Sequence, residues 1–235
     1  MLRAARLVVL VLAVLVAACA QPVREKGALS AQPAPQGFPT QDYAQATAQG
    51  KRVYRVDPAR SVVVITVRRG GSLARFGHDH VVASHGVQGF VAPDAGRADL
   101  FVPLTELTVD EPALRAQAGF DTQPGEADIA GTRDNMHAMV LETQRFPFAL
   151  IRIDTVDKME SRATLDVAIT LHGVQRNLVV PVMLEISPGE VSASGLIEFN
   201  QSDFGIAPFS ILGGAVQVQD RLSLRFAVRA SSPPE

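Results

Sequence analysis

The residues in this sequence best suited to chemistry are His78 and His80, which are separated only by Asp79. If the segment is extended, both imidazoles point to the same side of the strand and can reach one metal ion, whereas Asp79 faces away. His85 or His137 would then supply a third ligand. The spacing predicts either a zinc or copper site of a metal-binding or redox accessory protein, or side chains that hydrogen-bond to neighbouring backbone at a strand end.

Motifs for catalysis are absent from the sequence. It contains no Gly-x-Ser-x-Gly nucleophile elbow, no phosphate-binding loop and no dinucleotide fingerprint. A formal net charge of −2 provides no basic face, so we expect no nucleic-acid partner. We interpret Arg133 and Asp134 either as an ion pair or as a polar contact at the mouth of a ligand cavity, and His172 as a structural residue of a turn. The sequence therefore predicts a protein that is not an enzyme and needs no cofactor.

Cys19, the only cysteine, ends a segment typical of secretory signals. Arg3 and Arg6 precede an uncharged apolar run, Leu7–Val16, and two alanines separate this run from Cys19. A positive start, a short apolar stretch and small residues at the cleavage site are typical of a signal peptide. The run is too short for a comfortable transmembrane helix. We therefore expect residues 1–18 to be removed during export.

The residues Leu15–Cys19 resemble the lipobox of bacterial lipoproteins. The resemblance implies that the Cys19 thiol carries lipid and becomes the new N-terminus, where several acyl chains give a stable membrane anchor. Ala20 stands where an aspartate would resemble an inner-membrane retention signal, so its presence favours the outer membrane. These features predict a protein on the periplasmic side of the cell envelope, held at the membrane by lipid.

Both ends of the mature chain differ in composition from its centre. Residues 19–50 are rich in Gln, Ala, Pro and Gly and bury too little apolar surface to offset the entropy of ordering. We therefore expect a flexible linker there, and a disordered tail over residues 231–235. A single folded domain would span residues 51–230.

Within this domain, apolar and polar residues alternate with a period of two, which predicts β-strands. Ala163–Leu171 and Leu222–Val228 are the clearest cases. Glu111–Ala118 and Glu126–Glu142 lack this alternation and are predicted to form one or two short helices. About eight short antiparallel strands need paired edges, and a closed barrel pairs them most completely. The predicted fold class is therefore mainly β, a single antiparallel lipocalin-like barrel.

Four segments of the domain resemble the YceI-like family, whose members are exported lipocalin-like barrels associated with polyisoprenoid binding. The segments are Tyr54–Asp57, Gly131–Pro147, Leu165–Val174 and Phe199–Ile206. The resemblance extends over residues 53–230 and rests on the order and spacing of the segments together. It implies non-catalytic binding of an apolar, isoprenoid-like lipid in the bacterial cell envelope.

If the barrel holds such a lipid, apolar side chains that face inward should line its path. The same residues would equally form a filled core, so a hollow barrel and a solid one with an interaction role both remain open. Formation of a homodimer is also left open. The predicted lining residues are Val63, Ile65, Val67, Phe90, Leu100, Val102, Phe148, Ile151, Leu165, Val167, Ile169, Val180, Val182, Ile197, Phe199, Leu224 and Phe226.

Overall fold

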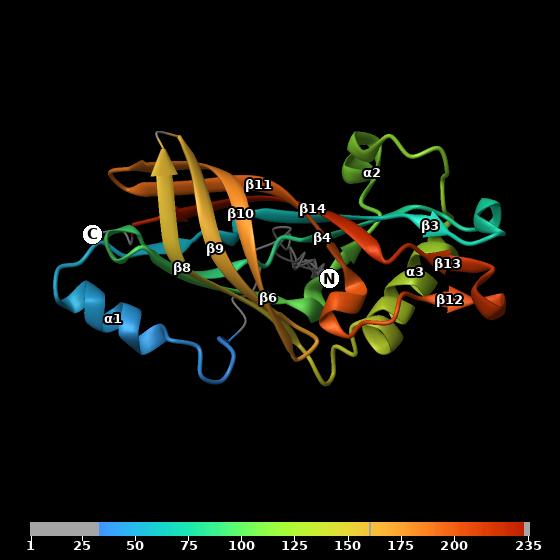
Figure 1. Ribbon diagram of the computed structural model, residues 1–235, viewed down its shortest axis with the longest axis horizontal. Coiled ribbons are helices and arrows are strands. Elements are labelled where there is room, and N and C mark those ends of the chain that lie inside the picture. Colours follow the sequence, from blue (N-terminus) through green and yellow to red (C-terminus); the bar gives the residue numbers. More distant parts are fainter. Residues whose placement is uncertain (1–32, 160, 233–235) are drawn as a thin grey trace, which may run out of the picture.

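The computed structural model describes residues 33–159 and 161–232, and their central feature is one antiparallel β-barrel (Figure 1). Eight strands form a closed ring, because β14 pairs with both β11 and β1. The predicted barrel of about eight antiparallel strands is confirmed. In their order around the ring, the strands are β1 (Tyr54–Val56), β5 (Gln88–Ala92), β6 (Arg97–Pro103), β8 (Phe148–Met159), β9 (Arg162–Leu171), β10 (Val174–Ser187), β11 (Glu190–Asn200) and β14 (Arg221–Ser231).

Three of the ring strands are broken and continue as further strands. A 3₁₀ turn, η1 (Pro58–Arg60), separates β1 from its continuation, and η4 (Leu104–Glu106) begins after Pro103 at the end of β6. Since proline has no N–H to donate, it interrupts the hydrogen-bonded ladder at both places. The continuations pair with β14 and with one another, and they are β2 (Val62–Val67), β4 (His80–Ser84) and β7 (Thr108–Val109).

Two short helices follow the third broken strand, as the sequence predicts. α2 covers Pro112–Ala118, and α3 covers Glu126–Asn135 before one π-helical turn, η5 (Met136–Val140). Met136 and the partly buried Ile129 pack against two buried leucines, Leu104 in η4 and Leu107 directly after it. The helical segment therefore covers one end of the barrel. Among the described residues, no helix is both long and apolar enough to cross a membrane.

A second, smaller sheet extends from the end of the barrel that carries α2 and α3 (Figure 1). Its order is β12 (Ser210–Ile211), β13 (Val216–Val218) and β3 (Arg69–Gly70). β3 follows β2 along the chain, and β13 precedes β14, so the small sheet is connected directly to two adjacent strands of the barrel.

The prediction of a flexible linker over residues 19–50 is wrong for its last part. Residues Thr40–Ala48 form a helix, α1, and only 4% of Tyr43 on this helix is exposed. The Tyr43 ring stacks on Phe90 with 5.0 Å between ring centroids, and its hydroxyl donates a hydrogen bond of 2.8 Å to Asp99 Oδ2. One buried aromatic residue thus orders a segment whose average composition is that of a linker. Residues 19–32 lie outside the described part of the chain.

The buried Asp99 carboxylate connects α1 to the outer face of the barrel. Besides Tyr43, it accepts hydrogen bonds from Arg97 Nε at 2.8 Å and from Arg152 Nε at 3.2 Å. Burial and the hydrogen bond to Asp99 raise the pKa of Tyr43 far above its ordinary value. A buried carboxylate with three donors is well satisfied, so α1 belongs to the folded domain.

The expected disordered tail also begins later than predicted. β14 extends to Ser231, which pairs with β1 and β11, and the Ser232 N–H donates to the Gly189 carbonyl at 3.0 Å. β14 extends beyond the predicted end of the domain because β1 and β11 still provide backbone hydrogen-bonding partners for Ser231. Composition alone does not reveal such pairing. Residues 233–235 lie outside the described part.

Gly89 provides a test of how tightly the broken strands are packed. Its φ of 141° is one that few side chains tolerate, and a Cβ there would lie 2.2 Å from the Asp99 carbonyl oxygen on β6. Because that atom belongs to backbone, Gly89→Ala should lower the free energy of unfolding by about 2–4 kcal/mol in urea denaturation.

Gly131→Ala is the matched control. Gly131 lies inside α3, and a methyl group added there would have no atom within 4 Å, so alanine should leave stability unchanged or raise it by up to about 1 kcal/mol. Equal stability of the two variants would contradict the packing of β5 on β6.

Candidate ligand cavity in the barrel

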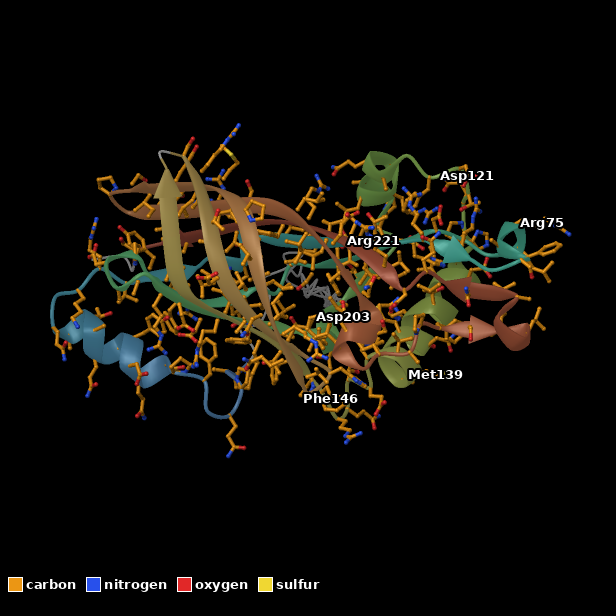
Figure 2. The ribbon with its side chains drawn as sticks, viewed as in Figure 1. Arg75, Asp121, Met139, Phe146, Asp203 and Arg221 are labelled. Carbon is orange, nitrogen blue, oxygen red and sulfur yellow. The ribbon has the colours of Figure 1, made fainter. Side chains whose placement is uncertain are left out.

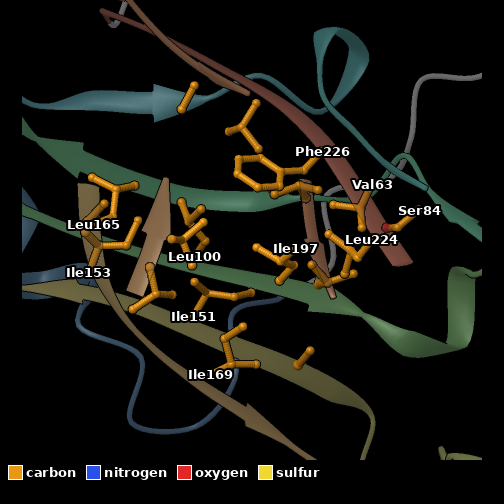
Figure 3. Close-up of a pocket in the computed structure, with 18 of the residues that line it drawn as sticks. Val63, Ser84, Leu100, Ile151, Ile153, Leu165, Ile169, Ile197, Leu224 and Phe226 are labelled. Carbon is orange, nitrogen blue, oxygen red and sulfur yellow. The ribbon is translucent and has the colours of Figure 1, made fainter. Parts of the chain in front are cut away.

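The interior of the barrel contains a cavity of about 450 Å³ whose wall is almost entirely apolar (Figure 3). The wall arises from strand alternation. On β9, Leu165, Val167 and Ile169 line the cavity, while Asp166 between them is exposed. On β14, Phe226 lines it and the adjacent Arg225 is exposed. Since neighbouring residues of a strand point to opposite faces, the charged residues remain in water and the apolar ones enclose the cavity.

Most of the predicted lining residues contribute to this wall. Some of them lie on the broken strands and others on the long hairpins, and Figure 3 shows several of them around the cavity. The predicted residues on the wall are Val63, Ile65, Leu100, Val102, Ile151, Leu165, Val167, Ile169, Val180, Ile197, Phe199, Leu224 and Phe226.

Four predicted lining residues lie elsewhere. Phe90 and Phe148 face outward, because Val91 and Ala149 beside them in sequence face the cavity. Phe90 stacks on Tyr43, and Phe148 packs edge-on against Phe101 with 5.8 Å between centroids.

The other two are apolar packing residues that do not line the cavity. Val67 packs against the cluster that includes Met136 at the helical end of the barrel. Val182 is buried in the main core. Strand alternation predicts the side on which such residues lie, but it does not locate the cavity along the strand.

Several further wall residues do not lie on alternating strands, and the sequence pattern does not reveal them. Leu104 and Leu107 belong to η4 and the residue after it, Leu141 follows η5, and Phe204 ends the 3₁₀ turn η6 (Gln201–Phe204). Irregular segments have no periodicity from which an inward direction can be read. Only the position of these segments in the folded barrel reveals their contribution.

Three polar residues are also part of the wall, and their polar groups already have partners. Ser84 Oγ accepts a hydrogen bond from the Gly86 N–H at 3.2 Å, and Gln201 Nε2 donates to the Gln219 carbonyl at 2.9 Å. Arg97, at the end of the wall near α1, is paired with Asp99. The cavity therefore presents few free polar groups to a ligand.

The histidine segment makes a different arrangement from the predicted metal site. His80 Nδ1 lies 2.6 Å from Oδ2 of Asp110, a carboxylate with no exposed surface, and the His78 ring centroid is 6.2 Å from that of His80. His78 Nε2 is 3.9 Å from Asp128. His80 is thus held by a carboxylate from the loop that precedes α2.

The remaining histidines do not join this pair. His85 Nε2 lies 3.0 Å from Glu111 Oε1. His137 has a buried Nδ1, and burial together with the charge of Arg133 lowers the pKa of its imidazole. In the described ranges 33–159 and 161–232, no three metal-binding side chains come together. The structure therefore does not bring His78, His80 and His85 to one point.

Asp110 is the centre of this polar cluster. Its Oδ1 accepts hydrogen bonds from the Val81 N–H at 3.0 Å and from Arg115 Nη1 at 2.6 Å. Burial alone would raise the pKa of Asp110, but the hydrogen bonds from His80, Val81 and Arg115 outweigh burial and lower it. Arg115 also donates to the Asp79 carbonyl at 2.7 Å. The cluster connects α2 to the start of β4.

The two other polar features have structural surroundings. His172, with a φ of 52° in the turn between β9 and β10, packs against Phe146 and lies 3.3 Å from Glu142. Arg133 and Asp134 are 3.7 Å apart and mostly exposed, so their ion pair contributes little to stability.

Comparison with known proteins now assigns the family. The sequence profile of the YceI-like domain matches residues 54–230, most of the chain. The chain belongs to the YceI-like family. The match covers the ring of strands up to Ala230 together with α2, α3 and the small sheet, whereas α1 precedes it. A comparison with curated protein sequences finds no match.

Solved structures share the YceI-like fold at low sequence identity. BcnA from Burkholderia cenocepacia is 14% identical with a TM-score of 0.56, and the alignment covers 75% of this chain and 99% of BcnA. A polyisoprenoid-binding domain from Saccharophagus degradans is 12% identical with a TM-score of 0.55, covering 77% of this chain and 98% of that domain. These similarities show the fold.

The Asp110 cluster predicts how stability depends on pH. Because folding lowers the pKa of Asp110, its ionised form stabilises the fold above the ordinary aspartate pKa of about 3.9, and this contribution is lost as the pH falls through the lower folded value. Asp110→Asn removes the charge that faces buried Arg115 and should cost about 3–5 kcal/mol at pH 7 in urea unfolding.

The exposed Asp134 supplies the control for this prediction. Asp134→Asn should leave both the stability at pH 7 and its decline in acid unchanged, since its partner Arg133 is also exposed. If Asp110→Asn were as stable as the native chain at pH 7, the role given to the buried cluster would be wrong.

Proposed function

We propose that this protein binds an apolar, isoprenoid-like lipid inside its barrel and does not act as an enzyme. The observation that carries the proposal is the apolar cavity of about 450 Å³, enclosed by a closed ring of strands. This volume falls in the range of about 300–1,000 Å³ typical of small-molecule sites. The apolar wall supports the chemical class of the proposed ligand.

A hydrocarbon chain suits this wall because neither partner requires hydrogen bonds from the other. Apolar contact contributes about 25 cal/mol for each Å² removed from water. A polar ligand would lose its hydrogen bonds to water and find few free groups in return, which is costly. The wall thus favours hydrocarbon over polar solutes without any specific anchor.

Relatives support the same ligand class. The Saccharophagus degradans structure with the same fold is described as a polyisoprenoid-binding domain. The cavity wall of the present chain contains no Asp, Glu, His, Cys or Lys side chain within the described residues. Acid–base catalysis, or activation of the Ser84 hydroxyl as a nucleophile, would need such a side chain beside the ligand, so the proposal is one of binding.

The placement of the protein is part of the proposal. Cys19 would carry lipid after removal of residues 1–18 and hold the barrel on the periplasmic side of the envelope, with the outer membrane favoured. An apolar ligand has very low solubility in water, so a carrier near a membrane would meet it far more often. No cofactor is required for this function.

Substitutions that fill the cavity test the proposed function. Ala193→Phe and Val180→Phe each place a large ring on the wall, so the extracted amount of bound lipid should fall several-fold while the barrel still folds. The measurement is mass spectrometry of an organic extract from protein purified without detergent, normalised to protein amount.

Outward-facing neighbours are the matched controls for these variants. Ala227→Phe lies on β14, paired with the residue after Ala193, and Val179→Phe immediately precedes Val180 on β10; both positions are exposed. These controls should retain the lipid of the native chain. Equal lipid content in all four variants, or no lipid in any sample including the native chain, would overturn the proposed function.

Lipid attachment has a separate test. A thiol is required for thioether-linked lipid, so Cys19→Ser should abolish the added mass on the N-terminal peptide and move the protein out of the membrane fraction of a bacterial host. An unmodified Cys19 in the native chain, or identical fractionation of the two proteins, would contradict the anchor.

A further inference from the structure

The free tip of the small sheet has a composition unlike that of the barrel surface. It consists of two adjacent segments, residues 68–78 with the turn η2 (Ala74–Phe76) and residues 205–219 with the turn η7 (Leu212–Gly214). The Leu73 N–H donates to the Ala215 carbonyl at 2.7 Å, so the two turns lie side by side. Neither segment contains an aspartate or a glutamate. We call this surface the tip.

Large apolar side chains at the tip are exposed to solvent. The exposed fraction is 66% for Phe76, 71% for Leu212 and 49% for Ile211. Apolar residues on a barrel strand that face outward are scattered among charged ones, as with Val179 beside Asp166 in the β9–β10 pair. At the tip they gather on two neighbouring turns. Exposed apolar clusters on soluble domains mark contact surfaces.

The charge at the tip has one sign. Arg68 is paired with Asp79 at 3.1 Å and Arg69 with Asp121 at 2.9 Å, so these two charges are already balanced. Arg75 lies 4.6 Å from the centroid of the Phe76 ring and forms no ion pair with any residue in the described ranges. Figure 2 shows Arg75 at the end of the molecule opposite α1. A cation next to exposed aromatic and aliphatic groups complements an anionic, apolar surface.

The tip is also continuous with the cavity wall. Phe204 and Ile206 line the cavity immediately before the segment enters the small sheet, and Ile65 of β2 lines it before β3 begins. A partner bound at the tip would therefore lie next to the two strands that lead into the wall.

We propose that the tip docks on a lipid bilayer that contains anionic lipids, with Phe76, Ile211 and Leu212 among the headgroups and Arg75 facing the lipid phosphates. Aromatic and aliphatic side chains partition into this interfacial layer, and arginine keeps its charged group among the phosphates. Phe76, Ile211, Leu212 and Arg75 are not part of the cavity wall, so this inference goes beyond the proposed function and does not depend on what the cavity holds.

A single tryptophan tests the docking directly, because the native chain contains none. Phe76→Trp in the full chain, processed as the cell processes it, should show a blue-shifted emission with phosphatidylglycerol vesicles. Bromine atoms in the acyl chains of those vesicles should quench the emission. The readout is local to the tip and is therefore independent of any anchor at the N-terminus.

The control is Val179→Trp, since Val179 is 69% exposed but lies on the side of the barrel. Its emission should not be quenched by the same vesicles. Adding Arg75→Gln to Phe76→Trp, or using phosphatidylcholine, should lower the ratio of quenched to unquenched tryptophan about fivefold, as expected for one arginine at an anionic surface.

Two results would overturn the proposal. Absence of quenching of Phe76→Trp in anionic vesicles would mean that the tip does not reach the bilayer and would assign the cluster to a protein partner. Equal quenching at Phe76 and Val179 would mean that the chain adsorbs without a preferred surface. Circular dichroism equal to that of the native chain shows that each variant is folded.

Discussion

Closure of the sheet is the constraint on which the rest of the structure depends. Once β14 pairs with β1, every ring strand has two neighbours, and one face of each strand must enclose a common interior. The apolar members of each alternating strand occupy that face. These side chains, mostly Val, Leu and Ile, surround a cavity of about 450 Å³ at the centre of the ring.

Polar clusters attach the other elements to this ring. Asp99 connects α1 to the outside of the barrel near one end, and Asp110 connects α2 to β4 near the other. Both carboxylates are buried and each has three hydrogen-bonding partners, so replacing either carboxylate would leave several buried donors without an acceptor. The ends of the barrel are therefore held by a few specific interactions, whereas its wall depends on many interchangeable apolar contacts.

Much of the fold could be predicted because alternation and turn residues are local signals. The β9 and β14 residues on the wall follow directly from the period of two, as do the helices at Pro112 and Glu126 from the loss of that period. The prediction for Phe90 and Phe148 is wrong because apolar character alone does not define which side of a strand is inside. Tyr43 and the Asp110 cluster depend on contacts between residues far apart in sequence, which one sequence does not reveal.

The central claim is that the barrel encloses a lipid chain, and a crystal structure tests it most directly. Protein purified without detergent from a bacterial host should show continuous, elongated electron density beside Leu165, Ile197 and Phe226. An interior in which the protein's own side chains close the space, with no such density, would contradict the account.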